Sequence, residues 1–474
     1  MSRASIDSAF RAVALAMLVG GAQGSDVVIE WQSTYQDIIR ITGGAPCPVS
    51  RAGPMMSLAV YDAVNSIDAV HDYNSSFQPY LSGLPVPAAE TSREAAAAAA
   101  AFRTLSELHQ NNPSAMALVN ARYASQLGAI PEGPAKTAGL AHGTAVADAL
   151  LAVRANDGFD SDPSYTPGTN PGDWRPTPDG PNVPGFSPHW GNVTPWGIAN
   201  GSQFRPDRLT AYGTMNDFLA SQEYADQING SATVPGVKDL GARISNTRTA
   251  DQTEAAWFWA NDRDGTSKPP GQLVDISKAV AADRGTTMSQ NARMFALINM
   301  AMGDACIAAW DCKYLTSCDL WRPTDAVRET QNDGNDQTVP DPLWLPLNDF
   351  QPPFPAYVSG HATMGAAHAG IMAALFGDNT TFTIGSDEFS VNTALGYDPN
   401  LTRTFTSFSD AAWENAMSRI WLGVHYYIDA VDGNVMGYQV AQYIFDNQLQ
   451  PVPAPGGVAC LVLIGAAVAG RRRW

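Results

Sequence analysis

Three segments in the last third of the chain carry residue types that bind tetrahedral oxyanions. Arg322 stands in a WRP triplet, the tripeptide SGH occupies 359–361 just before an apolar run, and Arg419 follows Ser418. A guanidinium offers two parallel donors to an oxyanion, and a serine at a helix N-terminus adds a hydroxyl and backbone amides. Together the three segments predict an anion pocket.

Histidines accompany two of these segments. His425 and Asp429 are four residues apart, so on a helix they would share one face. The carboxylate could then bind one ring nitrogen and leave the other for the anion, which makes the histidine a nucleophile or a metal ligand. Alone, such a pair is usually a local hydrogen bond, and a serine at a helix start is usually a cap. The prediction of an anion site therefore depends on the joint occurrence of the three segments.

The order R-P, then SGH, then S-R-x5-H-x3-D resembles the vanadium haloperoxidase and type 2 phosphatidic acid phosphatase superfamily. The segments DWRPTP and AWDCKY are similar to the bacterial branch of vanadium chloroperoxidase-like proteins, and the resemblance extends from Val27 to about Asn447. It implies vanadate as the cofactor. The implied anion-binding residues are Lys313, Arg322, Ser359, Gly360 and Arg419.

The resemblance also implies the catalytic roles. His425 would be the axial ligand of vanadium, oriented by Asp429, and His361 would be the acid/base group. The implied reaction is the oxidation of a halide by hydrogen peroxide to hypohalous acid, which halogenates a small organic acceptor. Phe354, seven residues before His361, matches an aromatic position of chloroperoxidases, although core packing also explains it.

One departure from the family pattern concerns the lysine. The family has K-x6-R-P, whereas Leu315 occupies that lysine position here and Lys313 lies two residues too early. A two-residue insertion, closed by a Cys312–Cys318 bridge, would still present Lys313 to the anion. Otherwise the lysine is displaced, and its loss would weaken oxidation more than anion binding.

Two other functions use the same residues. An acid phosphatase would form a phosphohistidine at His425, which water hydrolyses with help from His361. Lipid phosphatases of this superfamily tend to be short and membrane-embedded, unlike this chain of 474 residues. A non-catalytic exported oxyanion-binding protein is the second alternative, but retention of both histidines argues against it.

Composition limits the partners. With 46 acidic residues against 28 Lys and Arg, the formal charge is −18, so nucleic acid is not an expected partner. Five cysteines are present, of which Cys460 lies in the C-terminal tail. The remaining even number permits disulfides in an exported protein, with zinc a weaker alternative, because no pair has C-x-x-C spacing.

Both ends carry targeting patterns. Arg3 and Arg11 precede an apolar stretch and small residues at Ala22 and Gly24, which is typical of a signal peptide cut after Gly24. The tail has prolines, an apolar run and three arginines, and it resembles a Pro-Glu-Pro sorting tag with Ala454 in place of glutamate. A plain membrane tail is the alternative. Export to the periplasm, the cell surface or the medium is expected.

Helical periodicity dominates, so we expect an all-α fold of two packed helical bundles with long Pro/Gly-rich loops. We predict a signal peptide (1–24), an N-terminal helical region (25–155), a loop region shaping an entrance (156–248), a C-terminal bundle with the site (249–450) and a tail (451–474). The predicted helices span 54–67, 88–109, 114–127, 135–154, 249–260, 287–314, 363–376 and 410–447, the last with a break.

Overall fold

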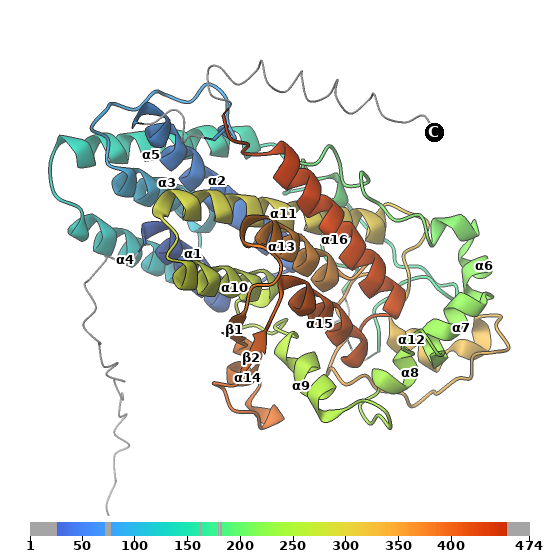
Figure 1. The fold of residues 1–474 in the computed structure, drawn as a ribbon. Helices are drawn as coiled ribbons and strands as arrows, with labels where there is room; N and C mark the ends of the chain where they lie inside the picture. Colours follow the sequence, from blue (N-terminus) through green and yellow to red (C-terminus); the bar gives the residue numbers. More distant parts are fainter. Residues whose placement is uncertain (1–25, 72–76, 162, 179, 181–182, 453–474) are drawn as a thin grey trace, which may run out of the picture.

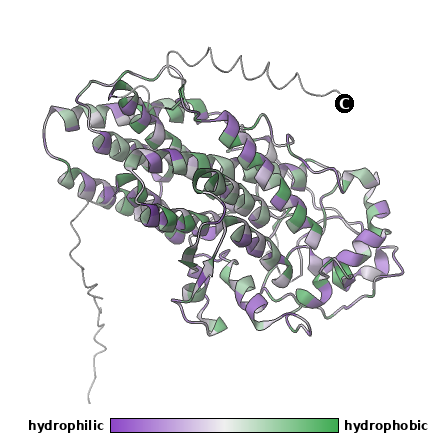
Figure 2. Cartoon of the chain, viewed as in Figure 1, coloured by the Kyte–Doolittle hydropathy of each residue, from purple (hydrophilic) through white to green (hydrophobic). Residues whose placement is uncertain are grey.

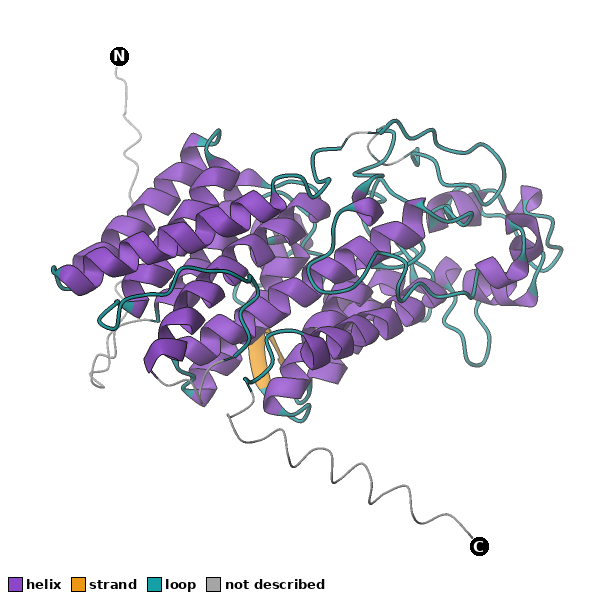
Figure 3. Cartoon of the chain, turned by 90° about the horizontal axis from the view of Figure 1, so that it is seen from above, coloured by secondary structure: helices purple, strands orange, loops and turns teal. Residues whose placement is uncertain are grey.

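The computed structural model describes residues 26–71, 77–161, 163–178, 180 and 183–452. The predicted signal peptide and most of the predicted tail lie outside these ranges. The described part is helical, with sixteen α-helices and one two-stranded sheet, as expected for an all-α protein. Helices form most of the body, and long loops gather at one end (Figure 3).

The N-terminal helices pack side by side at one end of the molecule (Figure 1). They are α1 (Val27–Thr42), α2 (Pro46–His71), α3 (Arg93–His109), α4 (Pro113–Ala129) and α5 (Pro134–Arg154). Helix α2 starts eight residues earlier than the prediction, with Pro54 inside it. The alanine run of α3 is buried against α5, where a Cβ at Gly143 would lie only 2.0 Å from the Ala96 carbonyl oxygen. Small side chains thus allow close helix packing.

A second group of helices packs next to α11 (Met288–Tyr314), which is almost entirely buried and also packs against α2. Apolar residues run along the helices of the body (Figure 2). The group comprises α10 (Lys268–Arg284), α13 (Gly360–Phe376), α15 (Phe408–Trp421) and α16 (Tyr427–Asn447). Among the described helices, α11 alone is long and apolar enough to cross a membrane, but 94% of its most apolar window is buried, as in a core helix.

Helix α13 packs along α16 at close range, because a Cβ at Gly437 would lie 2.2 Å from the Thr363 carbonyl oxygen. The predicted break in the last helical stretch falls at 422–426, between α15 and α16. The sequence pattern misses α10, since Pro269, Pro270 and Gly271 stand at its start. Prolines are tolerated in a first helical turn, where the amides have no intrahelical acceptor.

Short elements fill the loop-rich end and the edge of the second bundle. They are α6 (Met215–Leu219), α7 (Gln222–Asn229), α8 (Val237–Leu240), α9 (Ala250–Phe258), α12 (Pro323–Arg328), α14 (Asp387–Val391) and the antiparallel pair β1 (Phe382–Gly385) and β2 (Thr402–Phe405). The 156–196 loop is anchored at its end, where the buried Asp304 carboxylate accepts the amides of Trp196, Gly197 and Ile198 at 2.7–2.9 Å.

Candidate active site

The SGH tripeptide begins α13, as predicted. Ser359 is the N-cap of the helix, and its hydroxyl accepts the amide of Ala362 at 3.4 Å. The Ser359 amide donates to the carbonyl of Asp429 at 3.0 Å, which ties the start of α13 to the first turn of α16. The positive end of the α13 dipole therefore lies beside the His425–Asp429 segment.

Arg322 is fully buried and approaches the same place from the start of α12. Its Nε donates to the carbonyl of Phe354 at 2.8 Å, and its Nη1 donates to the carbonyl of Val424 at 2.6 Å and lies 3.2 Å from His425 Nε2. Its Nη2 is buried with no hydrogen-bond partner among the described residues. Burial lowers the pKa of this guanidinium to about 9, so it stays charged at neutral pH.

Arg419 reaches the site from the last turn of α15 and is also fully buried. Its Nη2 donates to Asp262 Oδ2 at 2.9 Å, and its Nη1 lies 3.5 Å from the carbonyl of Trp259. Its Nε is buried and has no partner within the described ranges. Two buried guanidinium groups thus each keep one unused donor, as expected of a site built for an oxyanion.

His425 lies in the turn between α15 and α16 and is held by Asp429. Its Nδ1 donates to Asp429 Oδ2 at 2.9 Å, and the same oxygen accepts the amide of Tyr426 at 3.0 Å. Burial, followed by the charge of Arg322, lowers the pKa of His425 well below its usual value. The imidazole is therefore neutral, with its lone pair on Nε2, which is the form that can ligate a metal or attack phosphorus.

His361 is the second residue of α13. Its Nε2 lies 3.2 Å from the carbonyl of Ala260 and 3.8 Å from Asp262 Oδ1. Burial and the positive charge of Arg419 lower its pKa to about 4, so this ring is also neutral at pH 7. Because Nε2 donates to Ala260, the lone pair of the neutral ring is on Nδ1.

Lys313 lies in the last turn of α11 and points toward the site. Its Nζ donates to the carbonyls of Pro355, Ala356 and Val358 at 2.6–3.0 Å, so it holds the segment that leads into SGH. Leu315, at the family's lysine position by strict counting, is 37% exposed. Lys313 therefore occupies the interior despite its shifted spacing, and its contact with the anion stays a prediction.

The Cys312–Cys318 bridge, which was one way to close a two-residue insertion, is not formed, since both residues are free thiols. The turn after α11 is closed instead by Thr316, whose hydroxyl donates to the Cys312 carbonyl at 2.9 Å and accepts the Cys318 amide at 3.2 Å. Cys47 and Cys306 are free and buried as well, with their sulfurs 3.9 Å apart, beyond the roughly 2.05 Å of a disulfide.

Four of the predicted site residues line a narrow cavity of about 20 Å³, whereas Lys313, Arg322, Ser359 and Asp429 are not among its lining residues. Gly360, His361, Arg419 and His425 line it, together with Trp310 and Phe354. Arg322 lies behind His425, at the 3.2 Å contact described above. Donors from α12, α13 and α15, with an oriented imidazole, suit a four-oxygen anion such as vanadate or phosphate. No cluster of three His, Cys, Asp or Glu side chains suited to a metal cation occurs in the described part.

Asp262 is a site residue that the sequence analysis missed. It lines the cavity, pairs with Arg419 and lies near His361. Its position depends on a tight loop between α9 and α10, in which Thr266 donates to the Asn261 carbonyl at 2.9 Å and Lys268 donates to the Asp262 carbonyl at 2.6 Å. No local pattern in the sequence marks this aspartate, because its partners are distant along the chain.

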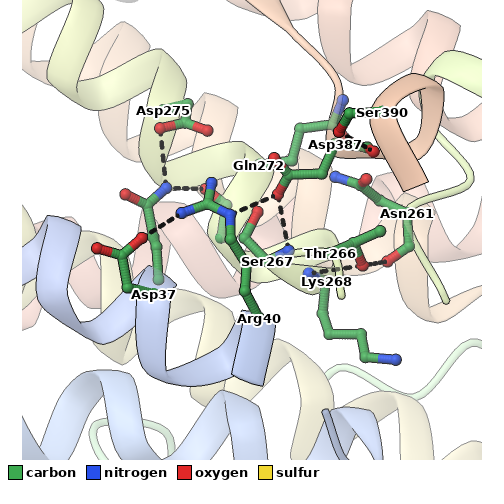
Figure 4. Close-up of polar contacts among 12 residues, drawn as sticks. Asp37, Arg40, Asn261, Thr266, Ser267, Lys268, Gln272, Asp275, Asp387 and Ser390 are labelled. Carbon is green, nitrogen blue, oxygen red and sulfur yellow. Dashed lines mark hydrogen bonds and ion pairs between the residues drawn. The ribbon is translucent and has the colours of Figure 1, made fainter. Parts of the chain in front are cut away.

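The loop that carries Asp262 is held by a hydrogen bond to the side chain of Asp387 in α14 (Figure 4). Asp387 Oδ2 accepts the Ser267 amide at 2.8 Å, and it also accepts from Nε of Arg40 on α1 at 3.0 Å. Arg40 in turn donates to Asp37 at 2.8 Å. Three segments that are far apart in the chain thus hold this wall of the site.

Comparison with known proteins agrees with this architecture. Residues 293–452 match the family model described as the VCPO second helical-bundle domain. Over 494 aligned positions the chain is 28% identical to vanadium chloroperoxidase of Curvularia inaequalis, covering 86% of this chain and 79% of that protein.

Solved structures share the fold. A crystal structure of a bacterial vanadium-dependent iodoperoxidase superposes with a TM-score of 0.70 at 22% identity, covering 90% of this chain and 97% of that one. An apo-type bacterial vanadium-dependent chloroperoxidase gives 0.64 at 17% identity, covering 86% and 94%. At these identities the structural likeness establishes the fold alone.

Proposed function

Because the chain is related to the vanadium haloperoxidases, we propose that it binds vanadate and oxidises a halide with hydrogen peroxide to hypohalous acid. One arrangement supports the proposal: Arg419, which has an unused donor, lines one cavity with two neutral histidines, and Arg322, which also has an unused donor, contacts His425 at 3.2 Å. A small organic acceptor would then be halogenated.

The residues would divide the work as follows. Arg322, Arg419, Ser359 and the start of α13 would hold the oxygens of vanadate, and His425 Nε2 would bind the vanadium. Bound vanadate would supply a Lewis acid that activates hydrogen peroxide toward the halide.

His361 would move the proton. Its low pKa keeps it neutral, so its Nδ1 could accept a proton from incoming peroxide and return it to the departing oxygen. Asp262 would hold both His361 and Arg419 in place. Phe354 and Trp310, with ring centroids 4.9 Å apart, would keep bulk water from the inner cavity.

An acid phosphatase is the second candidate. The observation that favours it is the His425–Asp429 hydrogen bond, which leaves Nε2 as a nucleophile beside an oxyanion cage. Phosphate and vanadate have the same tetrahedral shape, so the same donors would hold either ion.

One assay separates the candidates. The purified protein is given orthovanadate, hydrogen peroxide and bromide with a dye that reports halogenation, and separately a phosphomonoester without vanadate. We expect dye halogenation that is lost in His425→Ala. Phosphate release without halogenation would support the phosphatase, and anion binding without either reaction would support a binding protein.

We further propose that the protein acts outside the cytoplasm, held by its C-terminal tail or released. The signal-like segment 1–24 and the apolar tail before Arg471 support this location. The N-terminal residue of protein recovered from cell fractions tests it. A mature chain that starts at Ser25 in the exported fraction is the expected result, and an intact Met1 in the cytosol would contradict it.

A further inference from the structure

Another cavity lies at the far end of α11 from the candidate active site. It has a volume of about 300 Å³ and is lined by residues of α2, of the first turns of α11 and of the end of α13. Arg293 lines it, and Lys313 lies roughly 30 Å further along the same helix, at 1.5 Å per residue. A volume of this size is at the lower end of the range for small-molecule pockets. The cavity is therefore a separate space that can hold a small organic molecule.

Most of the cavity wall is apolar, and it is held in place before any ligand binds. Phe77 is fixed by Asn65, whose Nδ2 donates to the Phe77 carbonyl at 2.7 Å and whose Oδ1 accepts the Phe77 amide at 3.0 Å. Such a wall favours the burial of hydrocarbon at a low entropic cost. Its larger aromatic and aliphatic side chains are Tyr61, Val64, Phe77, Met294, Leu375 and Phe376.

Arg293 is the one cation among the lining residues, and it is half-buried. Its Nε donates to the carbonyl of Leu449 at 3.0 Å, and its guanidinium lies over the ring of Phe77, 4.3 Å from the ring centre. Within the described part of the chain, it forms no ion pair with a carboxylate, and its two terminal nitrogens have no hydrogen-bond acceptor. Burial lowers the pKa of Arg293, because a charge is costly to bury without a partner.

Ser289 lies one helical turn before Arg293, so both side chains share the face of α11 that lines the cavity. Its hydroxyl forms no hydrogen bond with the residues that the structure describes. Ser289 also stands in the first turn of the helix, where backbone amides lack intrahelical acceptors and the helix dipole favours negative charge. The guanidinium and the helix start thus both favour an anion at this side of the cavity.

The neighbouring polar side chains are already bonded. Asp68 is the one carboxylate among the lining residues, and it pairs with Arg93 at 3.0 Å with its side chain only 18% exposed. The Gln290 side chain accepts the Thr287 amide at 2.8 Å as part of the cap of α11. The guanidinium of Arg293 is therefore available for a ligand, whereas the carboxylate opposite its charge is not.

We propose that this cavity binds a small amphiphilic monocarboxylate, such as a medium-chain fatty acid. The carboxylate lies on Arg293 and Ser289, and the hydrocarbon chain lies against the apolar wall. The two terminal nitrogens of the guanidinium donate one hydrogen bond to each carboxylate oxygen, and the serine hydroxyl donates a third. A second negative charge on the ligand would be repelled by the formal charge of −18, so a monocarboxylate is preferred. The inference does not depend on the proposed haloperoxidase function.

Three probes divide the ligand into its parts. Octanoate, 1-octanol and acetate are each titrated into the purified full-length protein, and binding is measured by calorimetry. We expect octanoate to bind and 1-octanol to bind at least about tenfold more weakly, because the alcohol lacks the charge-assisted hydrogen bonds. Acetate, which has no hydrocarbon chain to bury, should not saturate the site. Equal affinities for octanoate and 1-octanol would overturn the proposal.

Substitutions at Ser289 test the site without removing a structural contact. Ser289→Asp places a competing carboxylate one turn before Arg293, and an acidic residue in a first turn stabilises a helix, so this variant should fold. We expect it to weaken octanoate binding at least about tenfold. Ser289→Asn, which has nearly the same shape without the charge, is the matched control and should weaken it by less than about threefold. Octanoate affinity that is unchanged in Ser289→Asp would refute the site.

A substitution of the arginine tests the cation directly. Arg293→Gln should weaken octanoate binding at least about tenfold, because the charged donor is lost. Arg284→Gln is the control, since Arg284 ends the neighbouring α10 and its side chain is 46% exposed. If Arg293→Gln does not fold, the Ser289 pair decides the outcome. Wild-type affinity in a folded Arg293→Gln protein would contradict the proposal.

Two methionines report where the ligand lies. Met294 lines this cavity, whereas Met364 lines the narrow cavity of the candidate active site. The protein is labelled with ¹³C in its methionine methyl groups, and the two signals are assigned with Met294→Leu and Met364→Leu. We expect octanoate to shift the Met294 signal and to leave the Met364 signal in place. Binding that leaves Met294 unshifted would show that octanoate lies elsewhere and would overturn the inference, whatever the outcome of the halogenation assay.

Discussion

His425 Nδ1 and Asp429 Oδ2 are 2.9 Å apart, and this hydrogen bond decides which nitrogen of the imidazole faces the cavity. Nε2 is left 3.2 Å from Arg322 Nη1, in the lone-pair form. Both residues are buried, so water cannot substitute for either partner. The chemistry proposed at His425 depends on this geometry.

Asp429→Asn should weaken vanadate binding about 10-fold to 100-fold, because loss of the carboxylate frees the imidazole to rotate or change tautomer. Fluorescence titration of the protein with orthovanadate measures the affinity. Asp446→Asn, which changes an acidic residue near the end of the same helix that contacts Gln442, is the control and should bind vanadate like wild type. Unchanged affinity in Asp429→Asn would show that Asp429 does not orient the ligand.

His361→Ala should keep vanadate binding and lose turnover by a factor of about 10² to 10⁴, the usual contribution of a positioned acid/base group. Vanadate affinity and the rate of dye bromination are measured on the same preparation. A variant that loses both together would assign His361 to anion binding instead of proton transfer.

Lys313→Met should reduce the free energy of unfolding by at least about 2 kcal/mol, because three buried carbonyls lose their donor. Urea unfolding measures this change, and vanadate affinity is measured in parallel. Lys278→Met, at a partly exposed lysine of α10, is the control. Weaker vanadate binding with unchanged stability would instead mean that Lys313 acts mainly on the anion.

His368→Gln should make the free energy of unfolding depend less steeply on pH below about pH 6.5. Burial lowers the pKa of His368 from 6.5 to about 3, so the unfolded chain binds the extra proton as the pH falls below 6.5. Stability is therefore complete above pH 6.5 and is lost toward pH 3, by about 1.4 kcal/mol per pH unit for this residue.

Glutamine at this position has no charge to titrate and can keep a hydrogen bond to Ser277, which lies 2.8 Å from His368 Nε2. Urea unfolding of both proteins at pH 7, 6 and 5 gives the two slopes. The histidines of the active site are present in both proteins and contribute equally. Parallel curves would show that His368 does not titrate on unfolding.

Much of the candidate site could be predicted because its residues stand in short, ordered motifs. Arg322, Arg419 and His425 could be identified through their joint order with SGH, which resembles a family signature, and the structure places Arg419 and His425 at one cavity with Gly360 and His361 and Arg322 in contact with His425. The all-α class could also be predicted, since apolar periodicity is a local property of the chain. The start of α10 was not predicted, because prolines are tolerated in a first helical turn but occur equally in loops and therefore do not indicate a helix.

The amino-acid sequence by itself thus determined the helical class and the residue types available for binding an oxyanion. Only the tertiary structure decided that Asp262 joins Arg419 and His361, that Lys313 faces inward despite its spacing, and that the four described cysteines remain thiols. Each of these contacts joins segments whose relative position depends on packing of the whole core. Hydrogen bonds and charges act at a few ångströms, and no local pattern in a chain records which distant groups come that close.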